Sequence, residues 1–183
     1  MVTKADWLDA GLKVLADEGS PALTIERLTT ELGLSKGSYY HHFKGTGGFR
    51  TALLEHFEKS FTTRLIDTVE RHPEADAATK LTELMELVLA DADNVRLEIA
   101  VRAWALQDPE ARAAQERVDQ ARTAYLQELC RGIGSVKEPD HLARLLYLIL
   151  IGAEQVVPPV PADELRALYA TTLTLATGAP FLT

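Results

Sequence analysis

The spacing of apolar residues constrains the fold of this chain more than any other feature. Along most of the sequence, apolar residues recur every three or four positions, which is the period of a helix with one buried face. No segment shows the two-residue alternation typical of a half-buried strand. The pattern therefore predicts an all-α protein. Glycines, prolines and capping residues divide it into nine expected helices, at about 4–17, 25–32, 36–43, 49–70, 76–90, 94–106, 109–131, 139–155 and 162–176.

The fourth expected helix carries an apolar residue at every fourth position. A continuous stripe of this kind must pack on another element, and we expect the helix that bears it to be a rigid, uninterrupted rod. The residues of the stripe are Phe49, Leu53, Phe57, Phe61, Leu65 and Val69.

The eighth expected helix is apolar on every side between Leu145 and Ile151. A helix with this pattern is normally buried all round. Because a chain of 183 residues cannot easily surround such a helix, a second copy is the expected cover. We therefore expect a homodimer that pairs through helices 8 and 9, from about Leu142 to Ala176.

The charge of the chain is unevenly distributed. The formal net charge is -8, yet the segment from Gly33 to Arg50 contains Lys36, Lys44 and Arg50 and no acidic residue. A locally basic segment on an acidic body can bind a polyanion at one place and repel it elsewhere. Three cations in such a segment also occur by chance, so charge alone does not decide the point.

Composition excludes several classes of protein. The single cysteine, Cys130, excludes an intrachain disulfide and any multi-cysteine metal site. The first residues lack the apolar region of a signal peptide. The most apolar stretch, Leu142 to Ala153, contains Arg144 and falls short of the about 20 residues that span a bilayer. We expect a cytoplasmic protein with no membrane association.

Two short helices joined by Leu32-Gly33-Leu34-Ser35 predict a helix-turn-helix. Gly33 is free to take the positive φ that such a turn favours, and Leu34 can pack between the helices. Thr24 and Ser35 are suitable caps for the two helices. In this motif the second helix enters the major groove of DNA.

Helical geometry assigns the faces of the second helix at about 100° per residue. Tyr39, His42 and Phe43 fall on one arc, which suits anchoring to a small core. The opposite arc carries groups that reach phosphates and base edges, and Gly37 on that arc permits close approach. The amides at the helix start, near Ser35 to Ser38, can bind a phosphate. The residues of the opposite arc are Lys36, Gly37, Tyr40, His41 and Lys44.

This segment resembles the tetracycline-repressor (TetR) family of regulators. The resemblance rests on Leu23-Thr24-Ile25-Glu26-Arg27-Leu28 and on Leu32-Gly33-Leu34-Ser35-Lys36-Gly37-Ser38-Tyr39-Tyr40-His41-His42-Phe43-Lys44. It implies a DNA-binding domain at residues 1–47 and a helical ligand-binding and dimerisation domain at residues 48–183. It also implies a repressor that binds a palindromic double-stranded operator and is released by a small-molecule effector, without a cofactor.

The resemblance also implies roles for single residues. Thr24 would contact a phosphate; Lys36, Gly37 and Ser38 would lie over base edges; Tyr40, His42 and Lys44 would contact the backbone or flanking groups. Many relatives open helix 4 with a lysine and an acidic residue, where this chain has Gly45-Thr46-Gly47-Gly48. Thr46 can still cap that helix and its amides can still meet a phosphate. The expected DNA-binding residues are Thr24, Ser35, Lys36, Gly37, Ser38, Tyr40, His41, His42, Lys44 and Thr46.

An effector pocket has weaker signals in the sequence. Met85, Trp104 and Tyr125 each suit ordinary core packing, but bodies of this size in the resembling family usually enclose a pocket lined by such groups. Arg102, two residues before Trp104, suits either an anionic ligand or the surface. We take Met85, Arg102, Trp104 and Tyr125 as the expected lining.

Other functions fit the sequence less well. His41 and His42 point in different directions on a helix, so they cannot chelate a metal together. Ser35, Ser38 and Asp108 would complete the parts of a hydrolase with these histidines, but no nucleophile elbow or oriented base appears, so we expect no enzyme. The remaining alternative is a helical adaptor that binds proteins through a former DNA-binding domain, against which the exposed cations and Gly37 argue.

Overall fold

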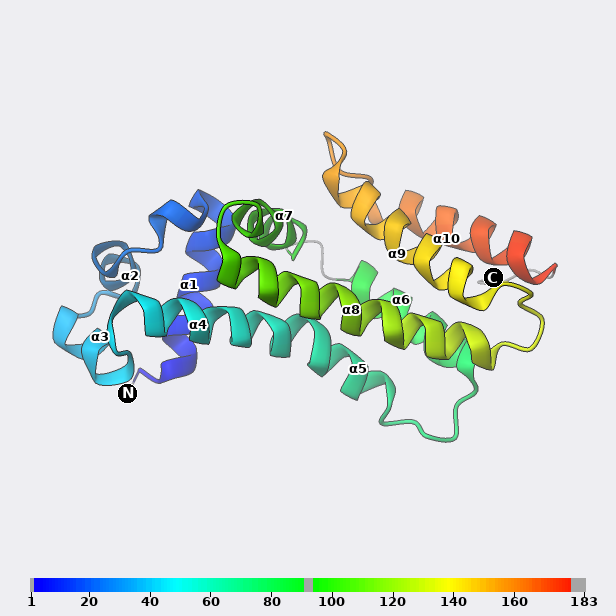
Figure 1. The fold of residues 1–183 in the computed structure, drawn as a ribbon, viewed down its shortest axis with the longest axis horizontal. Coiled ribbons are helices and arrows are strands. Elements are labelled where there is room, and N and C mark those ends of the chain that lie inside the picture. The colour runs from blue at the N-terminus through cyan, green and yellow to red at the C-terminus, as the bar shows by residue number, and fades with distance from the viewer. Residues whose placement is uncertain (1, 91–93, 179–183) are drawn as a thin grey trace. The chain divides into compact units, whose positions relative to one another are not determined.

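The computed structural model describes residues 2–90 and 94–178. Over these residues every regular element is helical (Figure 1), which confirms the predicted all-α fold. The elements are α1 (Lys4–Glu18), a 3-10 turn (Ser20–Ala22), α2 (Ile25–Leu32), α3 (Lys36–His42), α4 (Gly45–Glu58), a π-helical segment (Lys59–Thr63), α5 (Arg64–Val69), α6 (Ala77–Leu89), α7 (Asn94–Ala105), α8 (Pro109–Gly132), α9 (Pro139–Gln155) and α10 (Ala162–Thr177).

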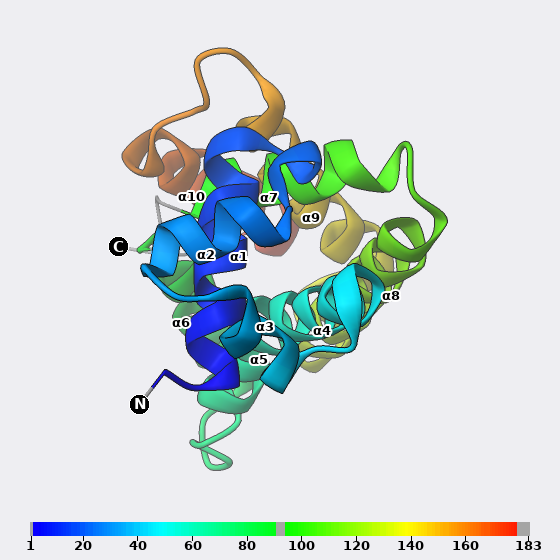
Figure 2. The ribbon, with the colours of Figure 1, turned by 90° about the vertical axis from the view of Figure 1, so that its left-hand side faces the viewer.

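The first three helices begin at the residues that their sequences predict and end within one residue of the predicted positions. Thr24 Oγ1 accepts from the Arg27 amide at 3.1 Å and caps α2. Ser35 Oγ accepts from the Ser38 amide at 3.3 Å and caps α3. Gly33 ends α2 with φ of 64°, a left-handed conformation that glycine adopts without steric cost. Helices α2 and α3 follow each other across the turn at Gly33 and are in contact (Figure 2).

The expected long helix is not one continuous rod. It begins at Gly45, four residues before Phe49, and the π-helical segment at Lys59–Thr63 separates α4 from α5. On an α-helix, a stripe of every fourth residue advances about 40° beyond a full turn at each step, so it drifts off the buried side. The wider π turn changes this phase. Phe57 is buried, Phe61 is only half-buried, and Thr62 takes the buried place at 3% exposed.

The described residues divide into two compact units. The first contains the residues before Thr62 and those from Asn94 to Val118, and the second contains Thr62 to Ala90 and Asp119 to Gly178. In the first unit α4 and α7 pack with the predicted DNA-binding helices. This packing unit is therefore larger than the segment 1–47 that the sequence assigns to DNA binding, and the functional boundary stays a prediction.

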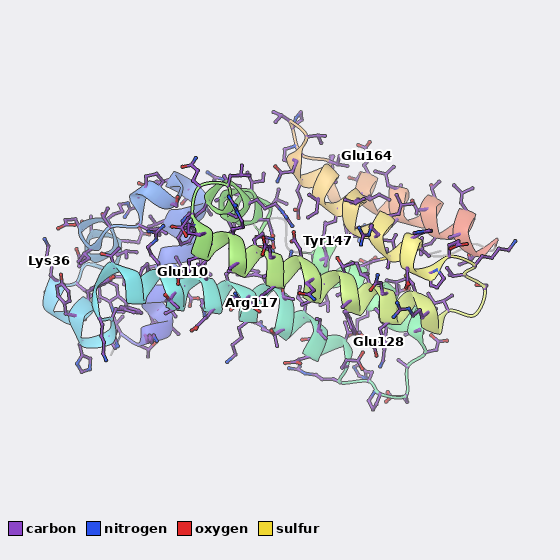
Figure 3. All side chains as sticks on the ribbon, viewed as in Figure 1. Lys36, Glu110, Arg117, Glu128, Tyr147 and Glu164 are labelled. Carbon is purple, nitrogen blue, oxygen red and sulfur yellow. The ribbon has the colours of Figure 1, made fainter. Side chains whose placement is uncertain are left out.

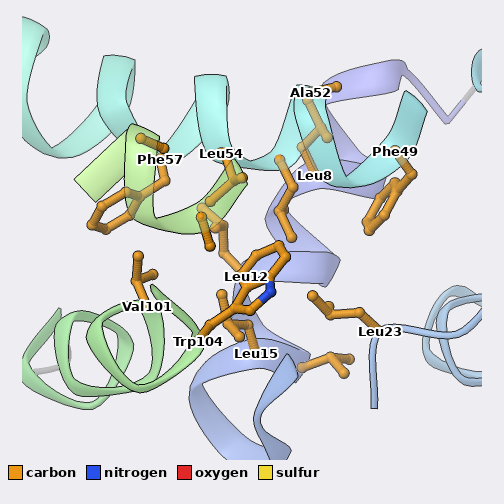
Figure 4. Packing of buried hydrophobic residues seen from close by; sticks show 14 of the residues in the cluster. Leu8, Leu12, Leu15, Leu23, Phe49, Ala52, Leu54, Phe57, Val101 and Trp104 are labelled. Carbon is orange, nitrogen blue, oxygen red and sulfur yellow. The ribbon is translucent and has the colours of Figure 1, made fainter. Parts of the chain in front are cut away.

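The core of the first unit forms where α1 lies against α4 and α7 (Figure 4). Trp7, Phe49 and Leu53 are each 0% exposed. Gly11 lets α4 come close to α1, because a Cβ there would lie 2.6 Å from Phe49 Cζ. Trp104 of α7 is 3% exposed and completes this core.

Polar contacts also connect α4 to α8 within the first unit. Arg117 donates to Glu58 Oε2 from Nε at 3.1 Å and from Nη2 at 2.9 Å. Thr51 donates its hydroxyl hydrogen to Glu110 at 2.5 Å. Figure 3 labels Glu110 and Arg117 on the α8 ribbon. These bonds add a polar border to the apolar contact between the two helices.

The second unit has a separate apolar core. It contains Leu81 and Met85 of α6, Tyr125 of α8 and Leu146 of α9, each at most 8% exposed. Half-buried polar pairs run beside it. They are Tyr125 Oη to Glu70 Oε1 at 2.6 Å, Tyr147 Oη to Asp119 Oδ1 at 2.7 Å, and Arg122 Nε to Thr62 Oγ1 at 2.9 Å.

Helices α9 and α10 expose large apolar side chains. Leu145 and Leu148 of α9 are 48% and 59% exposed, and Leu168 and Leu175 of α10 are 43% and 81% exposed. Helix α9 is thus uncovered on one side in the single chain, although its sequence is typical of a helix buried all round. Among the described residues, no helix has the length and hydropathy needed to cross a membrane.

Candidate nucleic-acid interface

Two aromatic residues attach α3 to the core of the first unit. Tyr39 is 0% exposed and its ring centroid lies 5.4 Å from that of Trp7 and 5.7 Å from that of Phe49. Its hydroxyl donates to the Gly45 carbonyl at 3.3 Å. Burial raises the pKa of Tyr39 to about 12, so the phenol is neutral at physiological pH. Phe43, 4% exposed, makes the second attachment.

The opposite face of α3 is open to solvent. Tyr40 is 58% exposed, and Lys36, Gly37, His41 and Lys44 are exposed as well. Apart from His42, the residues of both faces of α3 lie as the sequence predicts. Figure 3 labels Lys36 on the outer side of α3. The result is one continuous surface that offers cations, a phenol and an imidazole, with a glycine that adds no bulk.

His42 lies between the two faces. It is half-buried, and its ring centroid is 6.2 Å from that of Phe43 and 5.0 Å from that of His41. This position allows partial packing together with partial access to a ligand. Within residues 2–90 and 94–178, no three His, Cys, Asp or Glu side chains gather as metal ligands would.

The starts of α2 and α3 offer further groups to an anion. Thr24 and Ser35 are exposed, and each side-chain oxygen already accepts an amide hydrogen of its own helix. A hydroxyl that accepts can still donate its own hydrogen. Both residues are therefore placed to cap a helix and donate to a phosphate at the same time. Ser38, in the first turn of α3, is half-buried.

Thr46 does not cap α4 as its sequence position suggests. The helix begins one residue earlier, at Gly45, and the cap position is Lys44, which makes no side-chain capping bond. Gly45 has φ of 81°, which only glycine adopts readily, and this shifts the helix start. Thr46 is instead an exposed residue of the first turn. The prediction of a Thr46 cap is wrong, while its contact with DNA stays a prediction.

The structure adds one contact that sequence reasoning missed. Lys36 Nζ donates to Glu26 Oε1, an ion pair between the starts of α3 and α2. The hydrogen bond and charge of Lys36 lower the pKa of Glu26, and Glu26 raises the pKa of Lys36, so both groups are charged at neutral pH. Ten residues separate them, so only the angle between the two helices reveals the pair.

The expected pocket residues are distributed over both units. Arg102 and Trp104 lie in the first unit, and Met85 and Tyr125 lie in the second. Trp104 packs against Arg50, whose guanidinium carbon is 4.8 Å from its ring centroid. A hollow of about 460 Å³ in the first unit lies between α4 and α8. It is lined by Thr51, Leu54, Glu55, Glu58, Glu110, Ala113, Ala114 and Arg117, and so by none of the four expected residues.

Comparison with known proteins bears on both the helix-turn-helix and the fold. Residues 8–53 match the family model of bacterial regulatory proteins of the tetR family. A curated relative, the uncharacterized HTH-type transcriptional regulator YuxN of Bacillus subtilis (strain 168), is 23% identical over 144 residues. That match covers 78% of this chain and 49% of the relative, so the chain spans about half the length of that protein.

Solved structures share the fold. A transcriptional regulator of the TetR/AcrR family superposes with a TM-score of 0.80 at 22% identity, over 93% of this chain and 97% of its own. A transcriptional regulator from Saccharomonospora viridis, solved in complex with choline, has a TM-score of 0.71 at 20% identity, over 93% and 94% of the two chains. Residues 8–53 are thus similar to the DNA-binding segment of the tetR family of bacterial regulatory proteins, and the two solved structures, at 22% and 20% identity, share the fold of the chain.

Proposed function

We propose that this protein is a DNA-binding transcription regulator that acts by binding and not by catalysis. The observation that carries the proposal is the two-sided α3 helix, with Tyr39 and Phe43 buried and Lys36, Tyr40 and Lys44 exposed. A helix-turn-helix offers this kind of surface to the major groove, where cations and polar groups meet phosphates and base edges. The family match at residues 8–53 supports the same reading.

We further propose that two copies pair through α9 and α10. The exposed leucines of these helices, Leu145, Leu148, Leu168 and Leu175, form an apolar surface that a second copy would bury. Gly152 of α9 is exposed, and a Cβ added to it would meet no described atom within 4 Å, so this position allows close helix contact. A symmetric pair would set two α3 helices about one DNA turn apart, and the operator would be a near-palindrome.

The effector proposal rests on the second unit. Met85 and Tyr125 share its core, and the Tyr125–Glu70 and Tyr147–Asp119 bonds give that unit polar groups that can orient a ligand. A ligand that binds one spacing of the α3 helices better than another would weaken DNA binding, and DNA would weaken the ligand reciprocally. We propose that the unliganded dimer represses by occupying its operator. Arg102 and Trp104 belong to the first unit, and their expected role in effector binding stays a prediction from the sequence.

Selection from a random duplex library at moderate salt tests the DNA-binding function. We expect an enriched near-palindrome, bound by the wild-type protein with nanomolar affinity and strong salt dependence. The Lys36→Ala, Tyr40→Ala variant should lose at least about tenfold in affinity for the enriched site. The matched control is Lys137→Ala, an exposed lysine outside the helix-turn-helix, which should bind as the wild type does.

Two outcomes would contradict the proposal. Equal operator affinity for the Lys36→Ala, Tyr40→Ala variant and the wild type would show that the surface of α3 is wrongly assigned. Absence of any enriched sequence would favour the alternative, in which the helix-turn-helix serves as a protein-binding surface. A reporter with the enriched site placed over its promoter then distinguishes repression from activation.

A further inference from the structure

The ion pair between Glu26 and Lys36 lies on the surface proposed to meet DNA. Lys36 is 59% exposed and Glu26 is 68% exposed, so neither side chain is buried by the fold. An ion pair with this exposure contributes little to stability, because solvent and salt screen it. The presence of an acidic group here, where phosphates are expected to approach, calls for a functional explanation.

The other charged residues near Glu26 form ion pairs that do not involve α3. Arg27 of the same helix donates to Glu18 at 2.7 Å and to Glu31 at 2.8 Å, and Lys13 pairs with Glu31 at 2.6 Å. The Arg27–Glu18 and Lys13–Glu31 pairs connect α1 with α2, and the Arg27–Glu31 pair lies within α2. Glu26 is bonded instead to Lys36, the first residue of α3, and thus to a cation on the proposed reading surface.

The chemistry of a lysine ammonium group determines what such a pair can still bind. The group has three N–H donors, of which Glu26 takes one. Two donors are left for the paired acceptors of a base edge, such as N7 and O6 of guanine. Base edges carry no net charge, so the carboxylate repels them much less than it repels a phosphate. A phosphate is an anion, and the carboxylate beside Lys36 opposes its approach.

We propose that Glu26 is a specificity-determining residue that makes Lys36 a reader of base edges in place of a binder of phosphates. On random DNA, Glu26 cancels the charge of Lys36 and lowers affinity. On the correct site, Lys36 keeps its bond to Glu26 and donates to base acceptors. Glu26 thereby widens the ratio between specific and non-specific affinity. This inference rests on the proposed DNA-binding function.

The test compares the full-length wild type with Glu26→Gln on two probes, a random-sequence duplex and the duplex enriched by selection. Glutamine keeps the size and hydrogen-bonding ability of the side chain and removes its charge. We expect affinity for the random duplex to rise about three- to tenfold, with a salt dependence steeper by about one phosphate contact. Affinity for the enriched duplex should change less than about twofold, so the specificity ratio falls.

Two controls locate the effect. Glu31→Gln removes an acid from the same helix that pairs with Lys13 and Arg27, and should leave the specificity ratio unchanged. Lys36→Gln should abolish the effect of Glu26→Gln in the double variant, because the acid acts through that lysine. Unchanged melting temperatures of the variants would show that the fold is retained.

The outcomes separate this inference from the proposed function. If Lys36→Gln weakens binding but Glu26→Gln leaves the specificity ratio as in the wild type, Glu26 has no such role and the DNA-binding function stands. An equal gain or loss on both probes also overturns the inference. If no variant and not even the wild type binds either duplex at low salt, both proposals are wrong.

Discussion

Arg50 Nη2 donates to Asp108 Oδ2 at 2.7 Å, and the other oxygen of the same carboxylate caps α8. Oδ1 of Asp108 accepts from the amides of Glu110 at 2.9 Å and Ala111 at 3.0 Å. Arg50 lies in α4, so one carboxylate serves the start of α8 and its contact with α4. The guanidinium also lies over the Trp104 ring. Arg50 and Asp108 are 58 residues apart in the sequence, and their ion pair links α4 to the start of α8 in the first unit.

Two substitutions at Asp108 should separate its roles. Asp108→Ala removes both the cap and the ion pair, and should lower the free energy of unfolding by about 1–2 kcal/mol. Asp108→Asn keeps a capping oxygen and removes only the charge, so its cost should stay below about 1 kcal/mol. Urea denaturation measures both values. Equal losses in the two variants would show that the cap contributes nothing.

The same carboxylate predicts a pH dependence. The Ala111 amide, followed by the charge of Arg50, holds the pKa of Asp108 below its ordinary value in the folded protein. Its stabilising contribution is therefore complete above the unfolded pKa of about 4 and is lost as pH falls through the lower folded pKa. The stability difference between the wild type and Asp108→Asn should shrink from pH 6 to pH 3. A difference that stays constant over that range would exclude this linkage.

Two glycines should respond oppositely to alanine. A Cβ at Gly11 would lie 2.6 Å from Phe49 Cζ and 3.0 Å from Leu53 Cδ1, inside a packed core. Gly11→Ala should cost about 1–3 kcal/mol, despite the better helix propensity of alanine. At Gly48, the nearest neighbour would be Lys44 Cβ at 3.9 Å, an ordinary contact. Gly48→Ala should be neutral or stabilising by up to about 1 kcal/mol in thermal unfolding.

Adjacent tyrosines should have opposite effects. Tyr39→Ala removes a fully buried ring and should destabilise the protein by about 3–5 kcal/mol. Tyr40→Ala removes an exposed ring, and stability should change by no more than about 0.5 kcal/mol, while affinity for the enriched duplex falls. Calorimetry and duplex binding measure the two properties separately. Full duplex affinity in Tyr40→Ala would place the phenol outside the interface.

The apolar surface of α9 and α10 predicts the oligomeric state. Sedimentation should show a dimer for the wild type, and Leu148→Arg should shift it to a monomer, because the cation would be buried without a partner. Leu106→Arg is a matched control, since Leu106 is 77% exposed and lies between α7 and α8. A monomeric wild type, or a dimeric Leu148→Arg, would place the interface elsewhere.

Features that depend on near neighbours in the sequence were predictable. The all-α fold follows from a period that repeats along the chain, and the caps at Thr24, Ser35 and Asp108 bond to amides within three residues. The faces of α3 follow from the fixed rotation of about 100° per residue in a helix. This is why the sequence correctly assigns Tyr39 to the core and the adjacent Tyr40 to the surface.

Features that depend on contacts between residues far apart in the sequence were not predictable. The repeat from Phe49 to Val69 predicts one rod, but the structure has a π-helical segment at Lys59–Thr63 that no local pattern indicates. The helix start at Gly45, one residue before Thr46, likewise depends on a positive φ that the sequence permits but does not require. Local patterns limit where a helix can run, whereas its interruptions and its first residue respond to what it packs against.

The sequence by itself determined the all-α fold, the caps at Thr24 and Ser35 and, apart from His42, the two faces of α3, because each depends on bonds and rotations within a few residues. Only the tertiary structure decided that Arg50 pairs with Asp108, that Phe49 packs against Gly11, and that Glu26 forms an ion pair with Lys36. These contacts join residues of different helices, and their geometry exists only after the helices have packed. The proposed effect of Glu26 on DNA binding by Lys36 also depends on such a contact, because the two residues belong to different helices.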